Sequence, residues 1–191
     1  MANEFYALMG RMRYIARWGL MRNTFSENIS EHSHQVAVLA HALALIRQKI
    51  LYLDGPDPDR CAVAALYHDA SEILTGDLPT PIKYYNPDIK LAYKEVERIA
   101  GNRLLDMLPP QLRESYASLV LEDEAEVEPI VKAADKLAAH IKCLEEQKMG
   151  NHDFDTAAKQ TWDAMKAMDM PELNWFLDFC LGAYKLDLDQ L

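Results

Sequence analysis

The residues with the clearest chemical potential lie in segment 66–72, Leu-Tyr-His-Asp-Ala-Ser-Glu, where an imidazole and a carboxylate are adjacent in a largely apolar run. The preceding residues have helical character and almost no polar groups, so burying His68 and Asp69 against them would be costly without compensation. A metal cation is one compensating partner, because imidazole nitrogen and carboxylate oxygen together suit Mn, Fe, Co, Ni or Zn. A buried, hydrogen-bonded His-Asp pair is the other interpretation that this dipeptide allows.

Glu72 adds a third titratable group to the same segment. If residues 58–74 form one helix, Glu72 lies four positions after His68 and three after Asp69, so the three side chains share roughly one face. A carboxylate beside a metal is well placed for general acid–base chemistry. A solvated helix residue is the alternative interpretation.

Two further polar residues stand near apolar helical faces elsewhere in the chain. His32 falls in the first turn of a helix predicted for residues 31–50, and Asp135 adjoins the apolar stripe of a helix predicted for residues 129–148. With the His-Asp pair they would offer an octahedral metal four ligands and leave room for water and substrate oxygens. Such a metal can activate water and polarise a phosphoryl oxygen for phosphate ester hydrolysis. Only a fold can bring these distant residues together.

The elements that must position these residues are all predicted to be helices, because apolar residues recur at three- and four-residue steps and no strand pattern emerges. Without a repeat or a domain boundary, the sequence predicts a single all-α domain over residues 1–191, with its motifs in 5–150 and C-terminal helices in 153–184. Ser30 is the predicted N-cap of the second helix. The predicted helices cover residues 3–15, 31–50, 58–74, 87–108, 110–121, 129–148, 153–168 and 171–184.

A rigid loop follows the His-Asp segment. Residues 75–81, Thr-Gly-Asp-Leu-Pro-Thr-Pro, can continue neither a helix nor a central strand. Directly after a candidate active-site helix, such a loop is suited to shape a pocket. The acidic stretch 122–128, by contrast, is predicted to be a solvated face, because it lacks the regular spacing of oxygen ligands.

Composition narrows the class of ligand. The 191 residues include 30 acidic and 20 basic side chains, for a net charge of -10, which argues against a nucleic-acid polymer as partner. A small phosphorylated substrate remains compatible, because one Arg or a metal can hold one phosphate. The three cysteines are predicted to be reduced core thiols. No signal peptide or apolar run of ~20 residues is present, so a soluble cytoplasmic protein without a membrane partner is expected.

The pattern of an early His, a His-Asp pair and a late Asp resembles the HD-domain phosphohydrolases, and more specifically their bacterial 5'-deoxynucleotidase family. The resemblance covers most of residues 5–150. It implies an HD-type helical bundle that hydrolyses deoxyribonucleoside 5'-monophosphates to deoxynucleoside and phosphate. The segments that carry it are Arg17-Trp18, Ser-Glu-His-Ser at 30–33, Tyr-His-Asp-Ala-Ser-Glu at 67–72, Thr-Gly-Asp-Leu-Pro-Thr-Pro at 75–81, and Val-Lys-Ala-Ala-Asp at 131–135.

The resemblance also implies a role for each matching residue. One divalent ion, commonly Co, Mn or Cu in that family, would be held by His32, His68, Asp69 and Asp135. Glu72 would activate the attacking water, and Arg17 would orient the phosphate and take part in catalysis. Asp77 is associated there with preference for deoxyribose, and the family is homodimeric. The residues implied to contact substrate are Arg17, Trp18, His32, Asp69, Asp77, Leu78, Pro79, Thr80 and Asp135.

Other interpretations stay open. Arg17 could be a salt-bridge partner, Trp18 a core aromatic and Asp77 a turn-forming residue. An HD phosphohydrolase acting on a ribonucleotide, a dNTP or a cyclic nucleotide is the alternative enzyme, although no cluster of Lys and Arg is expected near the signature to hold a triphosphate. A non-catalytic nucleotide-binding protein is the third reading, against which the intact ligand set and Glu72 argue.

Overall fold

The computed structural model describes residues 3–83 and 86–190, and its regular elements are helices, as predicted. Within this part of the chain the one strand-like feature is an isolated antiparallel bridge between Ala16 and Asn28. None of the described helices is long and apolar enough to cross a membrane. The helices are α1 (Phe5–Met9), α2 (Ile29–Leu45), α3 (Pro58–Tyr67), α4 (Glu72–Thr75), α5 (Thr80–Lys83), α6 (Pro87–Asp106), α7 (Pro110–Val120), α8 (Glu128–Lys148), α9 (Asp155–Ala167) and α10 (Pro171–Phe179).

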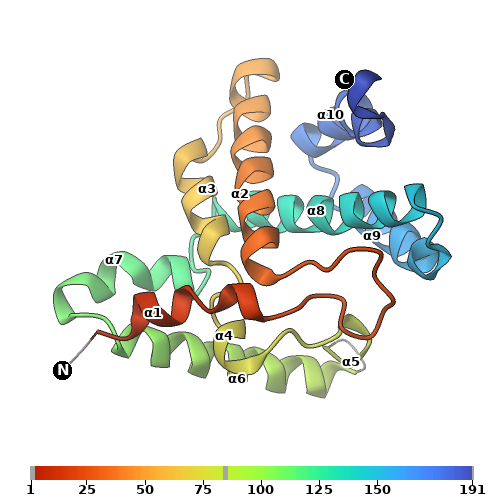
Figure 1. The fold of residues 1–191 in the computed structure, drawn as a ribbon. Helices are drawn as coiled ribbons and strands as arrows, with labels where there is room; N and C mark the ends of the chain where they lie inside the picture. Colours follow the sequence, from red (N-terminus) through yellow and green to blue (C-terminus); the bar gives the residue numbers. More distant parts are fainter. Residues whose placement is uncertain (1–2, 84–85, 191) are drawn as a thin grey trace.

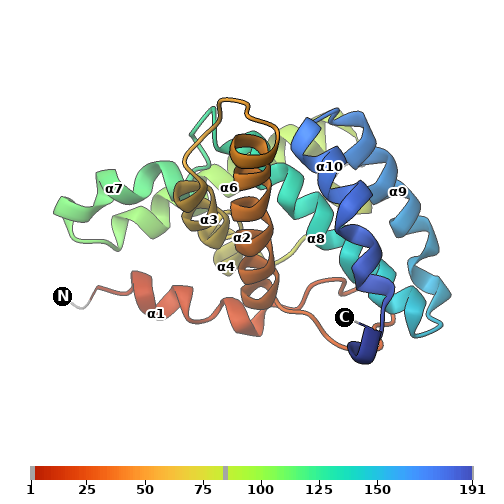
Figure 2. The same ribbon diagram turned by 90° about the horizontal axis from the view of Figure 1, so that it is seen from above.

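Two larger hydrophobic clusters organise these helices, and a smaller third cluster of Cys143, Phe154 and Ala158 packs against Trp18. The larger one joins α2, α3, α8 and α10 through side chains such as Leu43, Leu137 and Leu173. A second cluster joins α1, α6 and α7, and it includes Phe5 and Ala70. Figures 1 and 2 show α1 and α7 on one side of the α2–α3 pair and α8 to α10 on the other, and Figure 1 shows α6 running beneath this pair. Because Ala70 belongs to the second cluster, the His-Asp segment lies where the two clusters meet.

Helix α2 begins earlier than the sequence predicts. Asn28 is its N-cap: the Asn28 side chain accepts from the backbone of Glu31, and the Glu31 carboxylate accepts from the backbone of Asn28. This reciprocal capping box requires a Glu or Gln three positions after the N-cap, which Asn28 has and Ser30 lacks. The assignment of Ser30 as N-cap is therefore wrong. The helix ends in a wider π-helical turn at Ile46–Ile50.

The single helix predicted for residues 58–74 is also wrong, because α3 ends at Tyr67 and α4 begins at Glu72. In the intervening turn, Ala70 N–H donates to Tyr67 O at 2.9 Å and Glu72 N–H to Asp69 O at 3.0 Å, so bonds of three-residue span replace the α-helical pattern. The signature residues therefore project from a bend, and the argument that they share one helical face does not hold.

Two other regions test the helix boundaries. The first predicted helix is divided into α1 and a 3-10 turn at Met12–Tyr14. The helices predicted from residue 87 to residue 148 match α6 to α8 apart from one or two residues at their ends. The two C-terminal predictions were too long, because 3-10 helices at His152–Phe154 and Leu181–Lys185 stand where α9 and α10 were expected to extend.

Candidate active site

The structure brings the four predicted metal ligands together from three elements. His32 comes from α2, His68 and Asp69 from the turn after α3, and Asp135 from α8. Ligand atoms of His32, His68 and Asp135 all lie within 4.8 Å of one another. His32 Nε2 is 3.1 Å from Asp135 Oδ1 and 3.7 Å from Asp69 Oδ2, and His68 Nε2 is 3.2 Å from the same Asp69 oxygen.

The hydrogen bonding of the two histidines fits a metal site. His68 Nδ1 lies 2.7 Å from the Ala65 carbonyl oxygen, which can only accept, so this nitrogen carries the hydrogen and Nε2 is free to act as a ligand. His68 Nε2 and His32 Nδ1 are buried and make no hydrogen bond. Buried polar atoms are normally satisfied. The donor set of two imidazoles and two carboxylates therefore fits a divalent cation.

The electrostatics of the cluster also favour a bound cation. Although burial opposes its positive charge, the Asp69 and Asp135 carboxylates raise the pKa of His68 to about 9. Despite burial, His68, His32 and Arg17 hold the pKa of Asp69 well below its usual range. The two carboxylates therefore stay ionised and call for positive charge, which a proton or a metal cation can supply.

Arg17 and Trp18 border this cluster and share one partner. Arg17 Nη1 lies 3.4 Å from Asp69 Oδ2, while its Nε donates to Glu27 Oε2 at 3.1 Å. Trp18 Nε1 donates to the same Glu27 oxygen at 2.9 Å. Glu27 is buried and was missed by the sequence reasoning, because the stretch around it has no hydrophobic period that would assign it to a face.

Glu72 is buried close to the ligand-bearing turn. Its Oε2 atom has no hydrogen-bond partner. Burial, together with the Asp69 and Asp77 charges, raises the pKa of Glu72 to about 9, while Arg17 and Lys83 act in the opposite direction. Glu72 is therefore a carboxyl group that can hold a proton near neutral pH.

The rigid loop after α4 reaches the same neighbourhood. Gly76, at φ 74°, ends α4 in a conformation that favours glycine. Burial raises the pKa of Asp77, and the positive charge of Arg17 only partly offsets this rise. The Asp77 carboxylate therefore lies within electrostatic range of the Arg17 guanidinium. Leu78 and Pro79 are half-buried. The side chain of Thr80 lies outside the described part of the structure.

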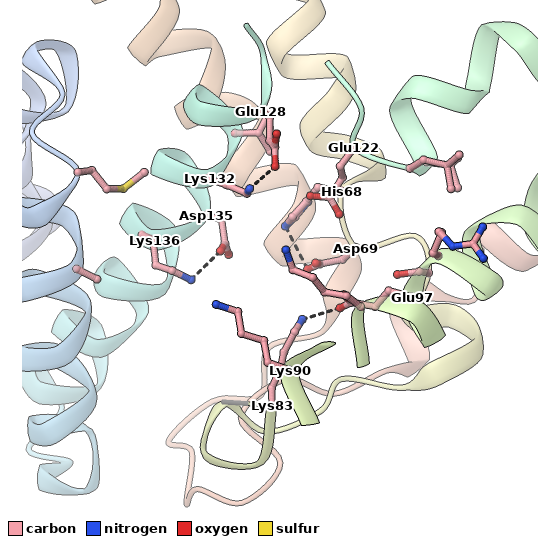
Figure 3. Close-up of a pocket in the computed structure, with 18 residues that line it drawn as sticks. His68, Asp69, Lys83, Lys90, Glu97, Glu122, Glu128, Lys132, Asp135 and Lys136 are labelled. Carbon is pink, nitrogen blue, oxygen red and sulfur yellow. Dashed lines mark hydrogen bonds and ion pairs between the residues drawn. The ribbon is translucent and has the colours of Figure 1, made fainter. Parts of the chain in front are cut away.

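A cavity of about 540 Å³ opens beside the ligands, with His68, Asp69 and Asp135 on its wall. Figure 3 shows lysine side chains entering it from two sides, Lys132 and Lys136 from α8 and Lys83 and Lys90 from the opposite wall. The expectation of no Lys and Arg cluster near the signature is therefore wrong, because these cations come from segments distant in sequence. The basic residues that line the cavity are Lys83, Lys90, Lys94, Arg98, Lys132 and Lys136.

Acidic partners moderate this positive charge. Lys83 pairs with Glu97 at 2.7 Å, Lys136 contacts Asp135 at 3.1 Å, and Lys132 pairs with Glu128. Glu128 lines the cavity together with Glu122. The acidic stretch expected to be solvated thus contributes two side chains to this wall.

The chain is similar to known proteins over nearly its whole length. The family described as 5'-deoxynucleotidase YfbR-like matches residues 4–184. A 5'-deoxynucleotidase of Vibrio atlanticus (strain LGP32) is 46% identical over 192 residues, covering 99% of this chain and 98% of the relative. A 5'-deoxynucleotidase of Shewanella oneidensis is 43% identical over 191 residues, covering 99% and 97%.

Solved structures share the fold. An HD-domain phosphohydrolase from Listeria innocua superposes with a TM-score of 0.81 at 19% identity, covering 97% of this chain and 90% of that one. The cyanophage S-2L HD phosphohydrolase bound to dA and one catalytic Zn²⁺ gives a TM-score of 0.65 at 24% identity, covering 94% and 95%. The predicted HD-type helical fold is confirmed.

Proposed function

The chain belongs to the YfbR-like 5'-deoxynucleotidase family, and from that premise we propose that it hydrolyses deoxyribonucleoside 5'-monophosphates to deoxynucleoside and phosphate, using one divalent metal ion. The observation that carries this proposal is the convergence of His32, His68, Asp69 and Asp135, in which the buried His68 Nε2 makes no hydrogen bond. A small phosphate ester, and no nucleic-acid polymer or membrane, is the proposed partner.

We assign the four converging residues as metal ligands. A cation held there would supply positive charge to the phosphoryl oxygens and lower the pKa of an attacking water. Co, Mn or Cu is our proposal for its identity, although imidazole–carboxylate sites accept several divalent ions and a protein of the same fold holds Zn²⁺.

Arg17 and Glu72 would perform the chemistry that belongs to the chain itself. The Arg17 guanidinium would bind phosphate oxygens with its planar fork of donors, and its Nη1 atom, 3.4 Å from Asp69 Oδ2, supports this role. Glu72, with its buried and unpartnered Oε2, would assist the proton transfers between the attacking water and the departing 5'-oxygen, and its raised pKa suits the step that protonates this oxygen.

The nucleoside would lie against Trp18 and the loop that carries Asp77, Leu78, Pro79 and Thr80. The Asp77 carboxylate would accept a bond from the 3'-hydroxyl and leave no room for a 2'-hydroxyl. We expect Asp77→Ala to raise activity on AMP relative to dAMP, measured as the ratio of kcat/KM values. An unchanged ratio would contradict this role.

The cationic cavity wall favours one second candidate, a nucleotide with more than one phosphate. Six basic side chains exceed what a monophosphate requires. Comparing dAMP, dADP and dATP as substrates separates the two possibilities. Faster turnover of dATP would replace the monophosphatase proposal.

We also propose a single domain over residues 1–191 that works in the cytoplasm as a homodimer. Apolar side chains on the exposed face of α6, Leu91 at 67% and Ile99 at 56% exposed, offer a surface that a second copy would cover. The described cysteines are all free thiols, which suits a reducing compartment. Light scattering coupled to gel filtration tests the dimer, and a monomeric mass would contradict it.

The deciding experiment measures phosphate release from dAMP and AMP. Protein stripped with chelator is reloaded separately with Co, Mn, Mg or Zn. Release from dAMP with little from AMP, seen only in reloaded samples, would support the proposed function. Equal release from both would remove the deoxyribose preference, and no release with any metal would overturn the proposal.

A further inference from the structure

Residues 15–28 join the N-terminal segment to α2 and carry Arg17 and Trp18; we call them the substrate arm. The arm contains no helix, and its ends are joined, because Arg17 N–H donates to the Glu27 carbonyl oxygen at 2.9 Å. It is therefore a closed loop whose base lies just before His32 on α2.

A single carboxylate oxygen holds both substrate residues of the arm. Glu27 Oε2 accepts from Arg17 Nε at 3.1 Å and from Trp18 Nε1 at 2.9 Å, and the Glu27 residue is only 8% exposed. Since Nε of Arg17 is occupied by Glu27, the remaining end of the guanidinium is directed at Asp69, with Nη1 at 3.4 Å. Glu27 thus determines which guanidinium donors face the candidate metal ligands.

The tip of the arm is fixed to α8 by a buried ion pair. Lys142 and Glu146 pair with each other, and both side chains are almost fully buried. Glu146 accepts from Thr24 N and Oγ1 at 3.0 and 2.7 Å and from Asn151 Nδ2 at 2.7 Å. Lys142 Nζ donates to Phe25 O at 2.8 Å and lies 3.4 Å from the Phe25 ring centroid. The arm is therefore placed relative to the helix that also carries Asp135.

The backbone of Trp18 shows that these contacts impose a conformation. Its φ of 59° lies in the left-handed region, which bulky residues avoid unless their surroundings hold them there. The indole ring packs on Phe154 with centroids 5.3 Å apart. Glu27, on the other side, fixes the indole nitrogen.

We propose that Glu27 is a positioning residue of the reaction, which acts through Arg17 and Trp18 while the Lys142–Glu146 pair holds the arm against α8. The inference rests on the proposed function, since it concerns how the phosphate ester is bound. Glu27 itself faces the two side chains it orients, and it transfers no proton and bonds no substrate.

The first test is a coupling experiment on the metal-reloaded protein with dAMP. Glu27→Gln removes a charge-assisted hydrogen bond, so we expect KM to rise by about 10- to 100-fold. In an Arg17→Ala background the same substitution should change KM by less than about threefold, because its main partner is gone. Glu31→Gln is the matched control, since Gln also serves in a capping box and the Glu31 carboxylate accepts from the Asn28 backbone N–H. Equal effects of Glu27→Gln in both backgrounds would overturn the proposal.

The second test needs neither metal nor turnover. With Trp162→Phe and Trp175→Phe, Trp18 is the one remaining tryptophan, and acrylamide quenching reports how firmly its ring is held. We expect Glu27→Gln to increase quenching, Thr24→Ala to increase it less, and Glu31→Gln to leave it unchanged. Unchanged quenching in Glu27→Gln would contradict the positioning role. If the parent protein releases no phosphate, the proposed function fails by itself, and the quenching result still decides whether Glu27 holds the arm.

Discussion

Helix α8 contributes to two groups of charged side chains, one in each half of the helix. Asp135 faces His32 and the His-Asp turn, and Glu146 pairs with Lys142. Glu146 and Lys142 have hydrogen-bond partners on the substrate arm, so this pair is satisfied. We call the two groups the ligand cluster and the anchor pair.

The ligand cluster differs because polar atoms in and beside it have no partner. His32 Nδ1, His68 Nε2 and Glu72 Oε2 are all buried without a hydrogen bond. Leaving a buried polar atom unsatisfied costs about 1–3 kcal/mol. The comparison teaches that buried charge alone does not identify a functional site, whereas buried charge with unmet hydrogen-bonding capacity does.

The largest effect that would sharpen this comparison is loss of activity at the ligand cluster. Asp135→Asn should lower kcat/KM for dAMP by about 10³-fold or more, because it would remove a proposed anionic metal ligand and with it the electrostatic stabilisation that a bound metal would supply. The unfolding free energy in chelator should change by less than about 1 kcal/mol, since the cluster then loses a buried charge as well as a partner. Steady-state kinetics and urea denaturation measure the two quantities. Near-normal activity would count against the metal assignment.

The anchor pair should show the opposite balance. Glu146→Gln leaves the Lys142 charge buried without its counter-ion, so we expect the unfolding free energy to fall by about 3–5 kcal/mol. Lys142→Met combined with Glu146→Leu should recover much of that stability while leaving the arm loosely held. Urea denaturation of the three proteins is the measurement. An unchanged unfolding free energy in Glu146→Gln would contradict the structural role of the anchor pair.

Acid pH should weaken the anchor pair selectively. Despite burial, hydrogen bonds from Lys142, Thr24 and Asn151 lower the pKa of Glu146 from its ordinary 4.5 to about 2. The stability that this shift provides is fully present above pH 4.5 and is lost as the pH falls towards 2; it amounts to at most about 3 kcal/mol. The stability difference between the native chain and Glu146→Gln should therefore narrow between pH 6 and pH 3. A constant difference would exclude this linkage.

The smallest expected effect concerns the cavity wall near the ligand cluster. Lys94→Gln with Lys132→Gln should lower kcat/KM for dAMP at low salt by about tenfold at most, because these cations attract a dianion to a chain of net charge -10. The loss should shrink at high ionic strength, where the attraction is screened. Lys159→Gln with Lys166→Gln, on α9, provides the matched control. A loss that salt does not alter would point to direct contact instead.

The sequence predicted the ligand cluster because its members are anomalous locally. A histidine or carboxylate beside an apolar helical face is visible without a structure, as His68 and Asp135 show, whereas His32 stands among polar residues and was assigned with the help of the family resemblance. The family resemblance then added Arg17, Trp18 and Asp77. The helix class and most boundaries followed from hydrophobic periodicity.

The remaining features depend on tertiary contacts. The bend after Tyr67 contains no Gly or Pro from which it could be predicted. It forms where Ala70 packs into the second hydrophobic cluster. The cationic wall combines lysines from α5, α6 and α8, which no local pattern connects. Glu27 lies next to Arg17 and Trp18 because the arm folds back on itself, which no local sequence pattern indicates.

The meeting of the two hydrophobic clusters at the His-Asp turn has a consequence for cooperativity. His32 and Asp135 belong to helices of the larger cluster, while Asp69 precedes Ala70 of the smaller one. A cation bound by all of these residues would link the two clusters, and its binding energy would add to the stability of both together. Removing the cation would make the unfolding of the two clusters less cooperative. Thermal unfolding would then show two transitions in place of one. In this fold a bound metal would therefore stabilise the contact between the two clusters as well as take part in hydrolysis.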